Sequence, residues 1–140
     1  MVHQKSLQPF YASLFGFLLS VKQHLIAIAR DYDLTFIQAT TLMLIDEDTP
    51  KPMNSIQKLY SCDASNITGI IDGLEDKELV RRGEDTHDRR VKIISLTDRG
   101  IKLRDKIYDD LIHLDPIILN GLTNIELAEF RSMITKLVIS

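Results

Sequence analysis

The feature of this sequence that most constrains its fold is a change in the spacing of its apolar residues. Before residue 77 and after residue 97, apolar residues recur every three or four positions, which is the period of amphipathic helices. Between these regions, residues 79–82 and 91–96 are short runs rich in β-forming residues, and the polar segment 83–88 separates them. Two such runs around a polar segment predict a β-hairpin with a long exposed tip. We therefore expect a mainly α fold with one small β-hairpin.

Signals at helix ends divide the helical regions into six helices. The first is predicted from Pro9 to about Asp31, because one stripe of apolar residues runs along it: Phe10, Leu14, Phe17, Leu18, Val21, Leu25 and Ile28. Three later helices begin at capping boxes, in which a polar cap and the residue three positions on bond to each other's backbone N–H: Thr35 with Gln38, Asn54 with Gln57, and Thr123 with Glu126. We expect helices at about residues 36–47, 55–61, 98–114 and 124–138, and a fourth helix capped by Asp63 with Ile67, Ile70, Ile71 and Leu74 facing inward.

The composition is that of one globular domain, which we place at residues 1–140. A chain of 140 residues can bury about two-thirds of its unfolded surface, and 44% hydrophobic with 26% charged residues is close to an average soluble protein. The N-terminus lacks the pattern of a signal peptide, and no uncharged apolar run approaches the roughly 20 residues of a membrane-spanning helix. We therefore expect a cytoplasmic protein with no membrane partner.

The overall charge does not indicate a nucleic-acid partner. The net charge is -3, and the segments 1–53, 54–97 and 98–140 each carry -1. Residues 79–92 are the exception, with five basic and three acidic side chains. A nucleic-acid interface must therefore depend on where these charges lie, because the phosphate interaction responds to the cations that touch it.

The order of the elements predicts a winged helix-turn-helix. Two short helices and a polar-fronted fourth helix precede the basic hairpin, and a helix of this kind presents side chains from its first turns to base edges in the major groove. The hairpin would carry its cations to the neighbouring backbone or the minor groove. We predict these DNA contacts: Ser65, Asn66 and Thr68 on the helix, and Arg89, Arg90 and Lys92 on the hairpin.

Three motifs in this region resemble the multiple-antibiotic-resistance-regulator (MarR) family. They are residues 63–82, the Asp88-Arg89-Arg90 triplet and the run Leu96-Thr97-Asp98-Arg99-Gly100, and they occur in the family's order and spacing. The resemblance is strong over residues 34–103 and extends to the flanking helices by position and pattern. It implies a homodimer, with a winged helix-turn-helix lobe at residues 34–97 and dimerisation helices at residues 1–33 and 98–140. It also implies that Asp88 holds Arg90 by an ion pair while Arg90 enters the minor groove.

The fourth helix departs from the family's pattern at four positions. The family often carries arginine on this helix, whereas Gly69 and Gly73 here supply no cation and each cost about 1 kcal/mol relative to alanine. Asp76 and Glu78 stand where the family more often has a basic residue and a glycine. We therefore expect a lower affinity for phosphate than is typical, with the hairpin contributing more of the binding.

The resemblance also implies an effector. The family commonly binds phenolic or other small aromatic molecules between the dimer helices and the DNA-binding lobe. By position in the sequence, four residues are candidates to border such a cleft: His24, Tyr32, Phe36 and Tyr60.

No other pattern in the sequence predicts a chemical site. The sequence has one cysteine, Cys62, which is too few for an intramolecular disulfide or a cysteine metal site. We favour its packing against Ile67 over a role as an oxidation sensor. The four histidines have no metal-ligand spacing within one helix. A glycine-rich phosphate loop, a nucleophile elbow and a paired metal motif are absent from the sequence, so we predict neither an enzyme nor a cofactor.

The sequence thus leaves two functions to compare. The leading hypothesis is a homodimeric repressor that binds a near-palindromic operator in double-stranded DNA and is released by a small-molecule effector. The alternative is a winged-helix dimer that does not bind DNA and acts as a protein-interaction module. The glycines and acids of the fourth helix favour the alternative, and the order of the elements with the Asp88-Arg89-Arg90 triplet favours DNA binding.

Overall fold

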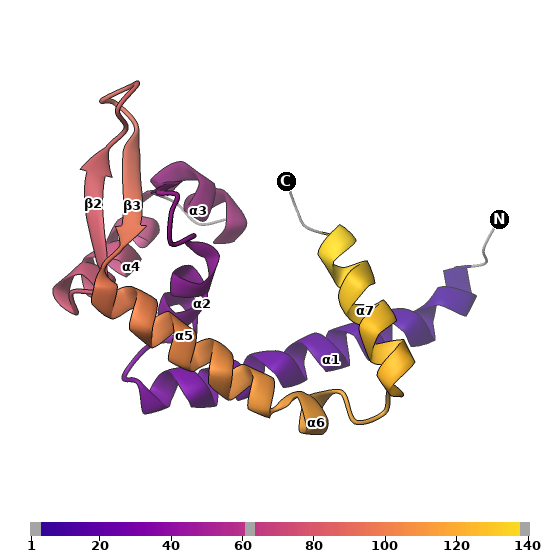
Figure 1. Ribbon diagram of the computed structural model, residues 1–140. Coiled ribbons are helices and arrows are strands. Elements are labelled where there is room, and N and C mark those ends of the chain that lie inside the picture. The colour runs from indigo at the N-terminus through magenta and orange to yellow at the C-terminus, as the bar shows by residue number, and fades with distance from the viewer. Residues whose placement is uncertain (1–3, 61–63, 138–140) are drawn as a thin grey trace.

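A computed structural model describes residues 4–60 and 64–137 of the chain (Figure 1). In chain order its elements are α1 (Gln4–Asp31), α2 (Phe36–Leu44), β1 (Lys51–Pro52), α3 (Met53–Tyr60), α4 (Ala64–Asp76), β2 (Val80–Glu84), β3 (Lys92–Leu96), α5 (Asp98–His113), α6 (Asp115–Ile118) and α7 (Asn124–Lys136). In Figure 1, α2–α4 and the sheet gather in a lobe at one end, and α1 and α5 run from it toward α6 and α7 at the other. The predicted mainly α, winged-helix fold class is confirmed.

The sheet has one strand more than the predicted hairpin. Its order is β1-β3-β2, with antiparallel pairing throughout. Strand β1 pairs Lys51 with Ile94 and Pro52 with Ile93. Pro52 fits there because an edge strand does not need every N–H for pairing. The predicted hairpin tip was also too long, since Gly83 and Glu84 belong to β2 and face Ile93 and Lys92.

The helix ends confirm two of the three predicted capping boxes. The side chains of Thr35 and Thr123 accept the N–H of Gln38 at 3.1 Å and of Glu126 at 3.2 Å, and those residues reach back to the cap in turn. The third prediction is wrong, because α3 already begins at Met53 and includes Asn54. Strand β1 leads directly into α3, which leaves no residue between them to act as the predicted cap.

Two helix boundaries differ from the prediction, and the short helix α6 was not predicted. Helix α2 ends at Leu44 rather than near residue 47, because Ile45 is extended and buried in the core. Helix α1 begins before Pro9, although the ring of Pro9 costs the helix a backbone hydrogen bond. Pro116 ends α5 as predicted, but it also lies in the first turn of the short helix α6, a position that proline favours.

The core lies in the lobe and under the adjoining parts of α1 and α5. Its fully buried side chains include Leu42, Ile45, Ile56, Ile67, Ile71, Leu74, Val80, Ile94 and Ile107. Within the described chain, neither α6 nor α7 has a buried residue, and α1 has none before Leu25. Of the predicted apolar stripe on α1, Leu25 and Ile28 are buried, whereas Phe10 and Leu18 are exposed.

Nearly all of helix α1 is apolar on average, over a longer stretch than the sequence pattern indicated. By length and composition alone, the segment Lys5–Asp31 meets the criterion for a helix that crosses a membrane. The prediction did not include this segment because it required an uninterrupted apolar run. Polar but uncharged residues interrupt the run, yet the mean hydropathy of the segment stays high. The same segment carries the exposed Phe10, Phe15 and Leu19, and it is joined to α7 by an edge-to-face contact of Phe17 with Phe130.

Two glycines lie where other segments approach their helices closely. A Cβ on Gly100, in the first turn of α5, would lie 2.0 Å from the carbonyl oxygen of Leu79. A Cβ on Gly73 would lie 2.6 Å from Nε2 of Gln38, the side chain that completes the α2 capping box. The overlap at Gly73 is with the end of a flexible side chain that can move aside, whereas a Cβ on Gly69 would meet nothing within 4 Å.

We predict opposite effects for alanine at two of these positions. Gly100→Ala should lower the free energy of unfolding by about 1–3 kcal/mol, because the backbone at Leu79 must move to relieve the overlap. Gly69→Ala should leave it unchanged or raise it by up to about 1 kcal/mol, because alanine favours the helix and meets no neighbour. Urea unfolding at one protein concentration measures both, and a Gly100→Ala protein as stable as wild type would contradict the packing.

Candidate nucleic-acid interface

Helix α4 is held to the core by one face and presents polar residues on the other. Ile67, Ile71 and Leu74 are buried at spacings of four and three, which fixes the rotation of the helix. As a result Asn66 and Thr68, two of the predicted DNA contacts, lie on its exposed face. Ser65 is in the first turn of α4, but its side chain is outside the described part of the structure.

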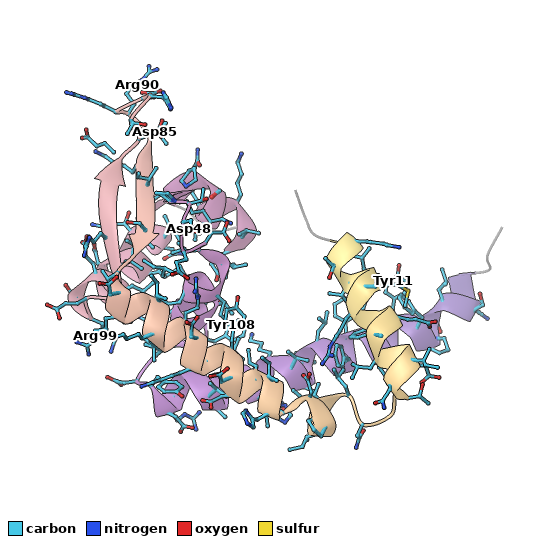
Figure 2. The ribbon with its side chains drawn as sticks, viewed as in Figure 1. Tyr11, Asp48, Asp85, Arg90, Arg99 and Tyr108 are labelled. Atoms are coloured by element: carbon cyan, nitrogen blue, oxygen red, sulfur yellow. The ribbon has the colours of Figure 1, made fainter. Side chains whose placement is uncertain are left out.

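Two aspartates organise the tip of the hairpin, beyond the ends of β2 and β3 (Figure 2). Oδ2 of Asp85 accepts the backbone N–H groups of His87 at 3.3 Å and Asp88 at 3.2 Å. Asp88 in turn accepts the backbone N–H of Arg90 at 3.0 Å. Sequence reasoning missed the role of Asp85. An aspartate followed by N–H donors two and three residues later is the available signal, since such turns favour that spacing.

The predicted ion pair between Asp88 and Arg90 is present in the structure. Nε of Arg90 donates to Oδ1 of Asp88 at 3.1 Å, and Nη2 donates to Oδ2 at 3.2 Å. These bonds, together with the one from the Arg90 backbone, lower the pKa of Asp88 below its ordinary value. The guanidinium nevertheless remains 91% exposed, so the pair sets its direction at the hairpin tip without covering it.

Residues from α3, α4 and the hairpin meet around one surface hollow of about 270 Å³. Three of the predicted DNA contacts line it, namely Thr68 of α4, Arg90 of the tip and Lys92 of β3. Asn54 and Gln57 of α3 line it as well, although the sequence pattern pointed to them only as helix-capping residues. The structure therefore brings the polar face of α4 and the hairpin cations to a common surface, while Arg89 is exposed beside Arg90.

Another hairpin cation, Arg82 of β2, contacts residues of α4. Its guanidinium bonds to the Asp72 carboxylate and lies 3.6 Å from Oε1 of Glu75, and it also donates to the Thr68 carbonyl at 3.2 Å. The acids of α4 are thus partly neutralised by a residue of β2. Sequence reasoning missed this pairing, because Arg82 is ten and seven residues from its two partners.

Ion pairs within the hairpin and with α4 reduce the number of unpaired cations below what the excess of basic residues in the sequence indicated. Lys92 lies opposite Glu84 in the sheet, and its Nζ is 3.3 Å from that carboxylate. With Arg82 and Arg90 paired too, Arg81 and Arg89 are the hairpin arginines that have no ion pair within the described residues. All these pairs are solvent-accessible, so a phosphate can compete for their cations at modest cost.

One of the four effector candidates, Tyr32, lines a different hollow at the C-terminal end of α1. Its hydroxyl donates to Oδ2 of Asp110 on α5 at 2.6 Å. This hydrogen bond, together with partial burial, raises the pKa of Tyr32 to about 12. The bond joins α1 to α5 at the edge of the lobe.

The other three effector candidates do not line that hollow. His24 Nδ1 is 2.7 Å from a carbonyl oxygen of its own helix, and the ring of Phe36 lies 5.2 Å below the ammonium of Lys22. The hydroxyl of Tyr60 contacts that of Thr40 on α2. The cleft proposed for these four residues therefore stays a prediction, as do the roles of Cys62 and the Asp63 cap, which lie outside the described residues.

Comparison with known sequences relates the lobe to a family of transcriptional regulators. Residues 34–92 match the sequence model of the MarR family. The HTH-type transcriptional repressor NicR of Pseudomonas putida is 36% identical over 77 residues, which cover 55% of this chain and 49% of that protein. The chain spans about half the length of the curated relatives that it matches. These relatives are transcriptional regulators rather than enzymes.

Comparison with solved structures extends the similarity to nearly the whole chain. The transcriptional regulator BldR from Sulfolobus solfataricus is 26% identical, with a TM-score of 0.74 over 98% of this chain and 100% of that one. The MepR–DNA complex from S. aureus is also 26% identical, with a TM-score of 0.67 over 91% of this chain and 95% of that one. The likeness to BldR therefore includes the long helices outside the lobe.

We predict that the Asp88 pKa depends on Arg90. In the wild type its pKa lies below the ordinary value, so the ion pair is present at neutral pH and is lost as the pH falls through that lowered pKa. In Arg90→Ala the side-chain bonds disappear and the pKa should rise toward its ordinary value. A carboxyl NMR titration of both proteins measures this, and an unchanged Asp88 pKa would show that the pair does not persist in solution.

Proposed function

Because residues 34–92 match the MarR family, we propose that the chain is a member of this family and a sequence-specific DNA-binding transcriptional regulator that acts as a homodimer. Residues 34–97 form the DNA-binding lobe in this proposal, and residues 1–33 and 98–140 provide the dimerisation helices. The exposed side chains of α4 enter the major groove, and the hairpin tip lies on the adjacent backbone and minor groove. This assignment draws on the match of residues 34–92 to the family.

The observation that carries the proposal is the hollow shared by α4 and the hairpin. Thr68 supplies a short hydrogen-bonding group to its lining, and Arg90 and Lys92 supply cations. Helix side chains of this kind read base edges, and nearby cations bind phosphates and fix the register. MepR, a protein of similar fold, has been solved in complex with DNA, which supports the same use of this surface.

The exposed apolar surface supports the dimer. A compact protein of 16.0 kDa exposes roughly 7,400 Å², whereas this chain exposes 10,211 Å². The excess, roughly 2,800 Å², is of the size that an extensive obligate interface covers. Large apolar side chains on α1 and α7 contribute to it, among them Phe15, Leu19, Ile125 and Leu137, all at least 59% exposed. A second copy of the chain would bury them.

Repression and effector release are the finer parts of the proposal. NicR, which this chain resembles over 77 residues, is named a repressor. A small aromatic or phenolic effector bound between the dimer helices and the lobe, near His24, Tyr32, Phe36 and Tyr60, would alter the angle between them. The half-site spacing would then no longer match the operator, since a dimer binds two half-sites about one helical turn apart.

We predict that Arg90→Ala weakens binding to any double-stranded DNA and lowers the slope of log K against log salt by about 1, because one phosphate contact is lost. Asn66→Ala should instead reduce the ratio of specific to non-specific affinity, because a base contact is lost. Fluorescence anisotropy with duplex DNA over a salt series measures both. Lys136→Ala, on α7 and away from the lobe, is the matched control for loss of one positive charge.

Two outcomes would contradict this assignment. If Arg90→Ala binds DNA like Lys136→Ala, the hairpin tip is not in contact with phosphate. A wild type with a salt slope near zero, or with no binding at low salt, would favour the winged-helix protein-interaction module over DNA binding.

We predict that charge on the exposed face of α1 separates the dimer. Phe15→Arg with Leu19→Arg places two cations four residues apart, and both residues are 59% exposed in one chain. Sedimentation velocity should give the mass of two chains for the wild type and of one chain for the variant. Leu44→Arg, on α2 of the lobe, is the control and should remain dimeric. A wild-type protein that sediments as one chain would overturn the dimer.

A further inference from the structure

A second hollow, of about 410 Å³, lies at the base of the hairpin, where the ends of α1 and α4 meet the first half of α5. Figure 2 shows Arg99, one of its lining residues, at the opposite end of the hairpin from Arg90. The proposed DNA surface does not include this hollow, and of the four effector candidates Tyr32 alone lines it.

The walls of this hollow carry an excess of positive charge. Four cations line it, namely Lys77 from the segment after α4 and Arg99, Lys102 and Lys106 from α5, whereas Asp33 is its one acidic lining residue. In a chain with a net charge of -3, such a concentration is unexpected. A concave site lined by charges of one sign attracts small ions of the opposite sign.

Two of these cations have no acidic partner. Lys102 and Lys106 lie one helical turn apart on α5, and within the described residues neither forms an ion pair. The floor between the cations is apolar, with Leu79 buried and Leu103 half-buried. These two lysines could therefore balance two negative charges of a ligand.

The other two cations are held by acids in an uncommon backbone conformation. Lys77 Nζ is 3.1 Å from Asp33, and Arg99 Nη1 is 3.5 Å from Glu78. Asp33 and Glu78 are the two non-glycine residues with positive φ, 58° and 61°, among the described residues. Each follows a helix end, where glycine is favoured because it has no Cβ. A glutamate in this conformation is uncommon enough to suggest a role for its side chain.

We propose that this hollow binds a small organic phosphate, a ligand with at least two negative charges. Lys102 and Lys106 hold the phosphate oxygens, and Asp33 and Glu78 pair with Lys77 and Arg99 until the ligand displaces them. Charge-assisted bonds from lysine and arginine to phosphate are among the stronger hydrogen bonds in proteins. The inference is independent of the proposed DNA binding, because it concerns a different surface and a different ligand.

Titration calorimetry with inorganic pyrophosphate in metal-free, low-salt buffer tests the site. The wild type should bind one pyrophosphate per chain with a Kd below about 1 mM, and Lys102→Gln with Lys106→Gln should weaken binding at least about ten-fold. Lys5→Gln with Lys136→Gln removes the same charge elsewhere and should leave the Kd unchanged. Glu78→Gln should tighten binding about two- to five-fold, because it removes the acid that competes for Arg99.

Several results would overturn the proposal. They are the absence of saturable binding by the wild type up to about 10 mM, equal weakening in the two double variants, or no tightening in Glu78→Gln. Glu78→Gln is informative even if the double lysine variant fails to fold. Citrate in a parallel titration distinguishes a phosphate site from a general polyanion site: equal affinity contradicts the phosphate class. A loss of DNA affinity in Lys102→Gln with Lys106→Gln as large as in Arg90→Ala would assign the hollow to the DNA surface instead.

Discussion

Helix α4, the hairpin and helix α5 are fixed to one another by a single junction around Leu79. The Leu79 N–H donates to the last turn of α4, and its carbonyl accepts the N–H of Thr97 at 3.1 Å. The Thr97 hydroxyl donates to the Glu78 carbonyl at 2.6 Å and accepts the N–H of Gly100 at 3.0 Å. Because Gly100 has no Cβ, the first turn of α5 can lie against the backbone of Leu79. The junction sets the angle of α4 relative to the hairpin, and both proposed binding surfaces depend on it.

The proposed DNA-binding surface shows how charge is arranged in a chain that is acidic overall. Arg82 crosses from β2 to neutralise acids on α4, and Asp88 orients Arg90 at the tip while leaving it exposed. The remaining surface offers a few cations near short polar side chains rather than a broad basic patch. Such an arrangement favours recognition that depends on position over strong non-specific attraction, since affinity for phosphate grows with the number of cations in contact.

The sequence predicted those features that depend on local patterns. The stripe of α4 and two capping boxes involve residues within a few positions of one another, and two short β-rich runs around a polar segment indicated the hairpin. The resemblance to the MarR family implied the Asp88–Arg90 pair. It missed strand β1, since two residues that include Pro52 carry no periodicity. The partners of Arg82 and the cationic hollow were also missed, because they join residues from separate elements. Gly73 looked unfavourable in the sequence, and its position against the end of the Gln38 side chain could not be predicted from it.

The central claim, that this chain is a dimeric operator-binding regulator, is tested most directly by selecting genomic DNA fragments with the purified protein and measuring affinity against salt for the best one. We predict a near-palindrome whose half-sites lie about one helical turn apart, bound with a steep dependence on salt concentration. Failure to enrich any fragment, even at low salt, would contradict the claim and direct attention to protein partners of the winged-helix dimer.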